Sequence, residues 1–347
     1  MTRTVDFRYV VVRNGADYTE LYPIRNSAPI LMMNESSEIK MSFSGSFAAD
    51  DSINWLTDQI RPEIVIDGVK SPLGVYLPAT VTPREDESTR SVQVEAYDRC
   101  WLVRDNYTEG RLFLAAGTNY IETIRQLLTS AGIANVIATP NAATFSEDRE
   151  DWDVGTSLLT IVNDLLAEIN YNPLWFNAQG IGILEPASVP SAANIKHTLD
   201  SDNIHSLLLP EISRETDVYQ APNVFLCIVS NADKTGPMVA TSENDNPQSP
   251  LSIPRRGRRI VSVQRVDNSA SQEELQAYAD RLRNESLITG ETINVKTALL
   301  PGFGVADVVA LHYGEISALC IERGWSMQLR VGGDMNHRLE KVVIALE

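Results

Sequence analysis

The chain has 347 residues, of which 43% are hydrophobic and 22% charged, a composition typical of folded globular proteins and not of disordered or collagen-like ones. Because this length exceeds the ~250–300 residues at which a single core stops growing, two or three domains are expected. The net charge of −17 has the wrong sign for sequence-independent DNA binding and for an anionic membrane surface, so both are disfavoured.

The cysteines and the lack of long apolar runs argue against two further classes of protein, those built on disulfides or zinc and those that are secreted or membrane-anchored. Cys100, Cys227 and Cys320 are odd in number and far apart, so the sequence predicts buried reduced thiols, with neither a disulfide framework nor a zinc site. The start of the chain contains no long apolar run, and no segment approaches the ~18 apolar residues of a membrane span. We therefore expect no signal peptide and no membrane anchoring.

Residues 1–98 are predicted to form an antiparallel β domain. Asn14-Gly15 and Asp67-Gly68 each separate two strand-like stretches, and both dipeptides tolerate the positive φ angles of a type I′ hairpin turn. Apolar and polar residues alternate over residues 39–44 and 92–96, which is the pattern of strands with one buried face.

Residues 99–209 change to a helical period and are predicted to form an α/β insertion. One helix is expected between a cap at Thr118 and a stop at Gly132, and a second is expected to end before Asn172-Pro173. A hairpin is predicted over residues 174–184. The apolar positions that define the helices are Ile121, Ile124, Leu128 and Ala131 in the first and Val154, Leu158, Ile161, Leu165 and Ile169 in the second.

Residues 210–347 are predicted to be β again, with one helix over residues 271–289. A strand at residues 223–229 precedes residues 230–254, a polar stretch that predicts a long loop. Ser271 and Glu274 form a capping box at the helix start. The buried face of this helix is expected to hold Leu275, Tyr278, Ala279 and Leu282. Further strands are predicted through Ile293, Val295, Thr297 and Leu299 and through Trp325, Met327, Leu329 and Val331, followed by a turn at Gly332-Gly333.

The sequence contains no recognisable catalytic, cofactor-binding or metal-binding motif. Its four histidines have no metal-ligand spacing, and no nucleophile signature is present. Gly180-Ile181-Gly182 lacks the third glycine of a dinucleotide fingerprint and falls in a predicted hairpin. We therefore predict no catalytic residue, no cofactor and no metal. The histidines are His197, His205, His312 and His337.

An acidic run is the main candidate for enzyme chemistry or for Ca²⁺ binding. An EF-hand needs acidic ligands at alternate positions, a glycine at the sixth and a glutamate at the twelfth, and the run does not meet that pattern. A glycosidase pair stays open, because its carboxylates can be far apart in the chain. The simpler interpretation is a solvated loop before a helix, whose N-terminus favours negative charge. The run comprises Glu147, Asp148, Glu150, Asp151 and Asp153.

One basic run contrasts with the acidic background. Four guanidinium groups in five positions repel one another unless acidic groups compensate them, so the run is a candidate interface with an acidic partner. The alternative is a tight turn with exposed arginines that leads into a strand at Ile260. The run comprises Arg255, Arg256, Arg258 and Arg259. The tryptophans Trp101, Trp152, Trp175 and Trp325 are expected to fill cores or interfaces and not to form a sugar platform.

Four stretches together carry a family resemblance. They are YDRCWL at 97–102 with the helix at 117–133; WDVGTSL at 152–158 with the hairpin up to residue 186; PNV at 222–224 with the strand, loop and arginine–glycine turn that follow; and AYADRL at 277–282 with residues 302–309 and the hairpin at 325–335. In this order they resemble the hub proteins of phage tails and contractile injection systems, including tailocins and defective-prophage particles. The resemblance covers most of the chain beyond about residue 91.

The resemblance implies an α+β, mainly β fold. Two β-barrel-like domains, residues 1–98 and 210–347, would flank the α/β insertion domain, residues 99–209, and form a ring on trimerisation. It also implies a structural baseplate or tail-tip hub in the virion, assembled in the bacterial host cytoplasm. The homotrimer's pseudo-sixfold ring would connect the tail tube to the central spike or tip. Implied partners are the other copies, the tail tube or distal tail protein, the spike or tip protein and the tape-measure protein, with DNA passing through without specific binding.

Two other functions compete with the non-enzymatic hub. A tail-tip glycosidase or peptidase that degrades the cell wall predicts a cleft with paired carboxylates or a metal. Family members that carry such modules have them after the hub region, and none is expected here. A host-carbohydrate-binding adhesin acting through residues 230–254 predicts exposed aromatic residues there, and this stretch contains none.

Overall fold

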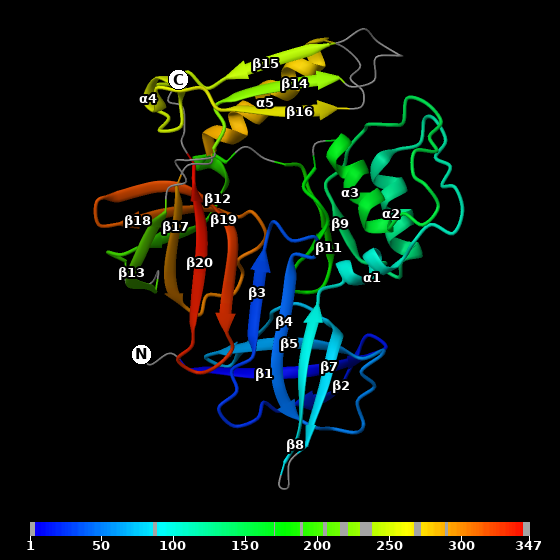
Figure 1. Ribbon diagram of the computed structural model, residues 1–347. Coiled ribbons are helices and arrows are strands. Elements are labelled where there is room, and N and C mark those ends of the chain that lie inside the picture. The colour runs from blue at the N-terminus through cyan, green and yellow to red at the C-terminus, as the bar shows by residue number, and fades with distance from the viewer. Residues whose placement is uncertain are drawn as a thin grey trace. The chain divides into compact units, whose positions relative to one another are not determined.

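The computed structural model in Figure 1 describes residues 4–85, 89–169, 171–187, 190–203, 207–215, 221–229, 238–266, 272–288 and 291–342. Strands make up 46% of the chain and helices 15%, which confirms the α+β, mainly β class. The chain divides into two units: unit 1 holds residues 1–189, 298–305 and 324–335, and unit 2 holds residues 190–297, 306–323 and 336–347. The three predicted domains are a different division and stay a prediction.

The first sheet of unit 1 is built from two hairpins. Its strands are β1 (Val5–Arg13), β2 (Ala16–Leu21), β5 (Gln59–Ile66) and β6 (Val69–Pro72), in the antiparallel order β2–β1–β5–β6. Asn14 and Gly15 have φ angles of 52° and 79°, and Asp67 and Gly68 have 49° and 83°. These left-handed pairs close both hairpins as the sequence predicts.

The second sheet of unit 1 joins segments from both ends of the chain. Its strands are β3 (Ile30–Asn34), β4 (Met41–Ala48), β7 (Leu77–Glu85), β8 (Arg90–Tyr97) and residues 324–328 of β19 (Ile316–Gln328). Residues 324–328 pair with β3, β3 with β4, β4 with β8 and β8 with β7, all antiparallel. The Tyr9 hydroxyl donates to the Leu329 carbonyl at 2.9 Å, so β1 is also tied to the C-terminal segment. The core between the sheets is aromatic, with ring centroids 5.3–6.1 Å apart among Tyr9, Phe43, Phe47 and Tyr76.

The insertion in unit 1 packs three helices and a small sheet around one apolar cluster. The helices are α1 (Cys100–Asp105), α2 (Tyr120–Ser130) and α3 (Leu158–Glu168), and β10 (Trp175–Phe176), β11 (Gly182–Leu184) and β9 (Val136–Ala138) form the sheet. The predicted hairpin is confirmed. Two predicted details are wrong. Asn119, not Thr118, caps α2, because its Oδ1 accepts from the backbone of Ile121 and Glu122. Val154 precedes α3 and is 59% exposed.

Unit 2 contains a sheet of long strands. Its strands are β12 (Ile195–Asp200), β13 (Leu208–Glu215), β17 (Thr292–Ala298), β18 (Val308–Tyr313) and β20 (Asp334–Lys341), together with the first part of β19, and a short 3-10 helix η1 (Ala192–Asn194) precedes β12. The order is β13–β17–β20–β19, and β18 pairs with both β19 and β12. Ile293, Val295, Thr297 and Leu299 are buried as predicted. The strand predicted to run through Val331 ends earlier, at Gln328, and Val331 is 72% exposed.

A smaller sheet in unit 2 carries one helix. Its strands are β14 (Val224–Val229), β15 (Val239–Glu243) and β16 (Val261–Val266), in the order β15–β14–β16, and α5 (Gln272–Ile288) packs on β15 and β14 (Figure 1). The prediction of one long loop over residues 230–254 is wrong, because β15 and the start of a short helix, α4 (Ile253–Arg256), lie within it. The predicted capping box at Ser271 lies outside the described residues.

The sheets of the described residues are open, and none closes into a barrel by strand pairing. Within the described part of the chain, no helix is long and apolar enough to cross a membrane.

Candidate functional site

The basic run is folded as one helical turn and its exit. Ser252 caps α4 by accepting from the backbone N–H of Arg255, and Pro254 occupies its first turn, where no intrahelical N–H bond is needed. Gly257 ends α4 in the left-handed region at φ 64°. Arg255 and Arg256 therefore lie on the helix, while Arg258 and Arg259 follow it. This division places the four guanidinium groups on two backbone segments.

Groups of the same chain compensate part of this positive charge. Arg259 forms a bidentate ion pair with Glu243 at 2.5 and 2.7 Å, which lowers the pKa of the Glu243 carboxyl. The Arg255 Nε donates to the Pro247 carbonyl at 2.8 Å, and Arg256 donates to the carbonyl of Ala221. Arg255, Arg258 and Arg259 nevertheless stay exposed. Their role as a partner interface stays a prediction.

The acidic run lies in the loop before α3, and its carboxylates point to different partners. Asp148 accepts from the backbone N–H of Ala116 at 2.8 Å, and Glu150 pairs with Arg111 at 3.2 Å. Asp151 pairs with Arg149 at 2.5 Å. Within the described residues, no group of three or more His, Cys, Asp or Glu side chains is arranged to hold a metal ion.

One constellation in unit 2 has the order of a catalytic triad and was not anticipated from the sequence. The Thr297 hydroxyl lies 3.0 Å from Nε2 of His337, whose Nδ1 lies 2.7 Å from Oε2 of Glu322. All three residues are at most 1% exposed. A nucleophile must reach its substrate, and this buried network offers no catalytic group to solvent. Its hydrogen bonds instead connect β17, β19 and β20. Its members come from three strands, so no local motif could have revealed it.

The other histidines have separate environments. His197 Nε2 lies 3.1 Å from the buried carboxylate of Asp307, which also pairs with Lys196 at 2.7 Å. His312 contacts the hydroxyl of Ser317 at 3.1 Å on the surface. His205 lies outside the described residues.

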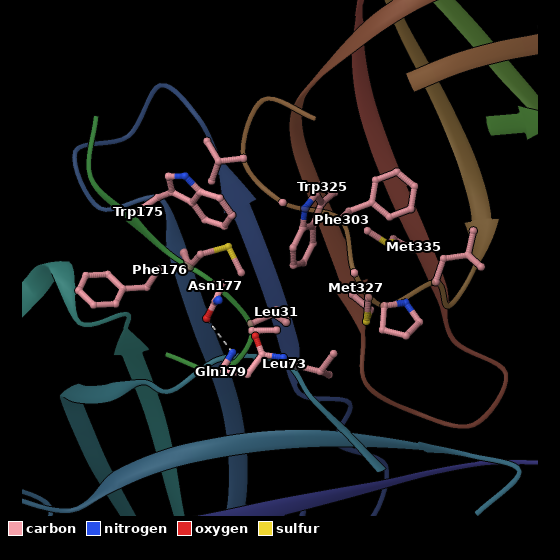
Figure 2. A pocket seen from close by; sticks show the side chains of 17 residues that line it. Leu31, Leu73, Trp175, Phe176, Asn177, Gln179, Phe303, Trp325, Met327 and Met335 are labelled. Carbon is pink, nitrogen blue, oxygen red and sulfur yellow. Dashed lines mark hydrogen bonds between the residues drawn. The ribbon is translucent and has the colours of Figure 1, made fainter. Parts of the chain in front are cut away.

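Unit 1 contains a half-open cavity of about 290 Å³. Trp175 and Trp325 lie on opposite sides of it in Figure 2, with Leu31, Phe303 and Met327 forming much of the remaining wall. The side chain of Asn177, which also lines the cavity, is held in place because its Oδ1 accepts from the backbone N–H of Gln179 at 3.0 Å (Figure 2). Among the described residues, no ionisable side chain lines the cavity. It could hold a neutral apolar group, but this lining supplies neither a general acid nor a general base.

Burial shifts the pKa of one carboxyl and of the three thiols. Asp98 is 2% exposed, and desolvation raises its pKa to about 6 although its oxygens accept from the backbone of Cys100 and Met41. Cys100, Cys227 and Cys320 are free and buried, which confirms the prediction. Burial raises the pKa of each thiol, that of Cys320 to about 12. Because the thiolate is the reactive form, none of the three is suited to nucleophilic chemistry.

Neither a protein-family model nor a curated protein matches the sequence. Solved structures share the fold. The tail protein from Neisseria meningitidis MC58 superposes with a TM-score of 0.68 at 11% identity, over 96% of this chain and 96% of that one. The 43 kDa tail protein of prophage MuSo2 from Shewanella oneidensis gives 0.69 at 11% identity, over 96% and 98%. The prophage tail protein gp18 from Listeria monocytogenes EGD-e gives 0.58 at 10% identity, over 95% and 94%. At these identities the likeness establishes a shared fold.

Proposed function

We propose, from the fold that it shares with these phage tail proteins, that the chain is a structural protein of a phage tail or of a phage-tail-like particle. The observation that carries the proposal is the near-complete mutual coverage: 96% of this chain aligns with 96% and 98% of two proteins described as tail proteins. A shared accessory domain would have aligned over part of one chain only. The likeness therefore extends over the whole fold and is not confined to one module.

The specific role that we propose is the baseplate or tail-tip hub, a homotrimer whose ring connects the tail tube to the central spike or tip. Open sheet edges support assembly: β7 ends one sheet of unit 1 and β13 ends the sheet of unit 2 among the described strands. Pairing between subunits would satisfy such edges. Proposed partners are two further copies, the tube or distal tail protein, the spike or tip protein and the tape-measure protein.

We propose that this hub has no enzymatic activity. The Thr297–His337–Glu322 network is buried, and the described residues that line the cavity of unit 1 include no ionisable group. Neither feature presents a catalytic group to a substrate.

The acidic charge supports a further part of the hub proposal, the passage of DNA without binding. A trimer carries a formal charge of −51 (3 × −17), so acidic residues on the wall of a central channel would repel DNA. A trimer structure with a neutral or basic channel wall would contradict this.

The structural role is tested in the producing strain. Deleting the gene should abolish intact tails in electron micrographs, and the chain should be found by mass spectrometry in purified wild-type particles. Intact, functional particles from the deletion strain would overturn the proposal.

The trimer is tested separately by light scattering after size exclusion. Three chains of 38.4 kDa should give a mass of about 115 kDa. The trimer would be refuted if both the purified protein and the protein released from particles had the mass of a single chain. That result would leave the tail role intact.

A further inference from the structure

The sheet β15–β14–β16 has two unlike faces. On one face, Ala240 and Ser242 of β15 are buried under α5, where the Ser242 hydroxyl donates to the Asp280 carboxylate at 2.6 Å. Because side chains alternate along a strand, Val239 and Thr241 point to the opposite face. In Figure 1, α5 lies along one side of these three strands.

The face opposite α5 carries an exposed apolar stripe. The strand register places Ile228 of β14 beside Val239, and Leu226 beside Val263 of β16. Val239, Val261 and Val263 are 49%, 50% and 50% exposed, and Leu226 and Ile228 are only half-buried. A sheet normally buries its apolar face against another layer, and a contiguous exposed one marks an interaction surface.

Exposed arginines border this face at β16, and the carboxylate of Glu243, on the β15 side, is paired with one of them, Arg259. Residues 253–265 contain five arginines and no Asp or Glu, within a chain whose net charge is −17. Arg265 lies on the open face itself, in register with Ile228, and the exposed Arg258 lies just before β16. An occupant that carries acidic groups beside an apolar stripe would therefore be complementary to this surface.

The dimensions of the face fit one helix. Three strands spaced ~4.8 Å apart span about 10 Å, which is close to the diameter of an α-helix with its side chains. Six residues of β14 extend for about 20 Å, which a helix covers in about 13 residues.

We propose that the open face of β15–β14–β16 binds an amphipathic helix of another protein of the particle. The apolar stripe of that helix packs on Val239, Val261 and Val263, and its Asp or Glu residues face Arg258 and Arg265. The bound helix gives the sheet a second helical layer opposite α5. The inference names a partner surface for the proposed tail role and rests on that role for the source of the helix.

Photo-crosslinking in purified particles tests the proposal. p-Benzoylphenylalanine replaces Val263, and in a matched control it replaces Val69, a valine of unit 1 that is 67% exposed. Mass spectrometry then maps each adduct. We expect Val263, and not Val69, to label a different particle protein, within a segment that has apolar residues three and four apart and Asp or Glu beside them.

The outcomes separate the two proposals. The helix proposal would be overturned if position 263 formed no adduct, or if its adducts were only with a second copy of this chain or with a basic or non-helical segment. The tail role would stand in each of these cases. Absence of the chain from purified particles would overturn the tail role and the inference with it.

Substitution gives an independent test. Val261→Asp combined with Val263→Asp should lower the amount of the crosslinked partner in particles at least tenfold, whereas Val69→Asp should not change it. Both proteins should melt within a few degrees of wild type, because the substituted side chains are exposed. If the double variant does not fold, Arg265→Glu replaces it, and unchanged partner content in that variant would overturn the charge pairing.

Discussion

The carboxyl group of Asp98 lies at the end of β8, where the chain enters α1. Its pKa is raised by burial to about 6, from an unfolded value near 3.8. Between these two values the folded chain binds more protons than the unfolded chain. Protonation of Asp98 therefore favours the folded state. This contribution to the free energy of unfolding is fully present below about pH 3.8 and is lost as the pH rises through about 6.

We predict that Asp98→Asn removes this pH dependence. From pH 4 to pH 7, the free energy of unfolding of the wild type should fall by roughly 2.4 kcal/mol relative to that of the variant, at about 1.4 kcal/mol per pKa unit. Urea denaturation at several pH values measures the difference. Asp51→Asn is a control of opposite sign, because Arg90 lowers the pKa of the Asp51 carboxyl. Parallel curves for wild type and Asp98→Asn would contradict the prediction.

The buried pair of His337 and Glu322 allows a second prediction at the residue scale. His337→Ala removes one partner of a fully buried pair and leaves the Glu322 carboxylate without its 2.7 Å contact. Leaving a buried polar group without its hydrogen-bond partner typically costs about 1–3 kcal/mol of unfolding free energy. His312→Ala, on the surface, should change it by less than about 0.5 kcal/mol. Chemical denaturation measures the free energy of unfolding of both variants. Equal losses in His337→Ala and His312→Ala would show that the buried network contributes little to stability.

At the scale of elements, the two short hairpins were predictable because their turn residues determine the backbone. Gly15 has φ 79°, and no atom lies within 4 Å of the place that a Cβ would occupy, so only backbone strain opposes a side chain there. Gly15→Ala should lower the free energy of unfolding by about 1–2 kcal/mol. Gly110 is equally uncrowded and has no left-handed φ, so Gly110→Ala should be nearly neutral. Thermal or urea unfolding measures both, and identical shifts would contradict the turn argument.

The arginine run allows a prediction about assembly. Replacing Arg255, Arg256, Arg258 and Arg259 with serine should leave the fold intact, since the ion pair of Arg259 is solvent-exposed and such pairs contribute little to stability. Assembly with a neighbour should be impaired. Circular dichroism tests the fold and particle yield tests assembly. A normal yield would remove the run from the interface.

Strand β15 shows why part of the fold was missed. Its buried positions are Ala240 and Ser242, which are small or polar, while the valine at 239 is exposed. The alternation of hydrophobicity that identifies a strand is therefore inverted, and the segment is typical of a loop in its sequence. The same inversion leaves the apolar side chains on the face that we propose as a helix-binding surface. Strand β17, with Ile293, Val295 and Thr297 buried, has the ordinary pattern and was predicted correctly.

At the scale of the whole molecule, the two units are interlaced in sequence. Unit 1 requires residues 298–305 and 324–335, and β3 pairs with residues 324–328. Local patterns identified these strands but not their partners, since nothing near residue 30 of the chain specifies pairing with residues almost 300 positions later. Folding of unit 1 therefore depends on contacts of high sequence separation.

We predict that a fragment of residues 1–189 does not reach the stability of unit 1. It lacks the strand beside β3 and the carbonyl that accepts from Tyr9, and it leaves an edge of β3 open to aggregation. Adding a peptide of residues 298–335 should restore protection of the β3 amides in hydrogen exchange. A fragment that is already monomeric and fully protected would contradict the prediction.

The three buried thiols have a practical consequence for studying the protein. None of the native cysteines presents an accessible thiolate, so a cysteine introduced on the surface should be the first to react with a maleimide dye or a nitroxide label. Pairs of such labels, one in each unit, would report the distance between the units by resonance energy transfer or by electron paramagnetic resonance. The wild-type background needs no cysteine removal before that measurement.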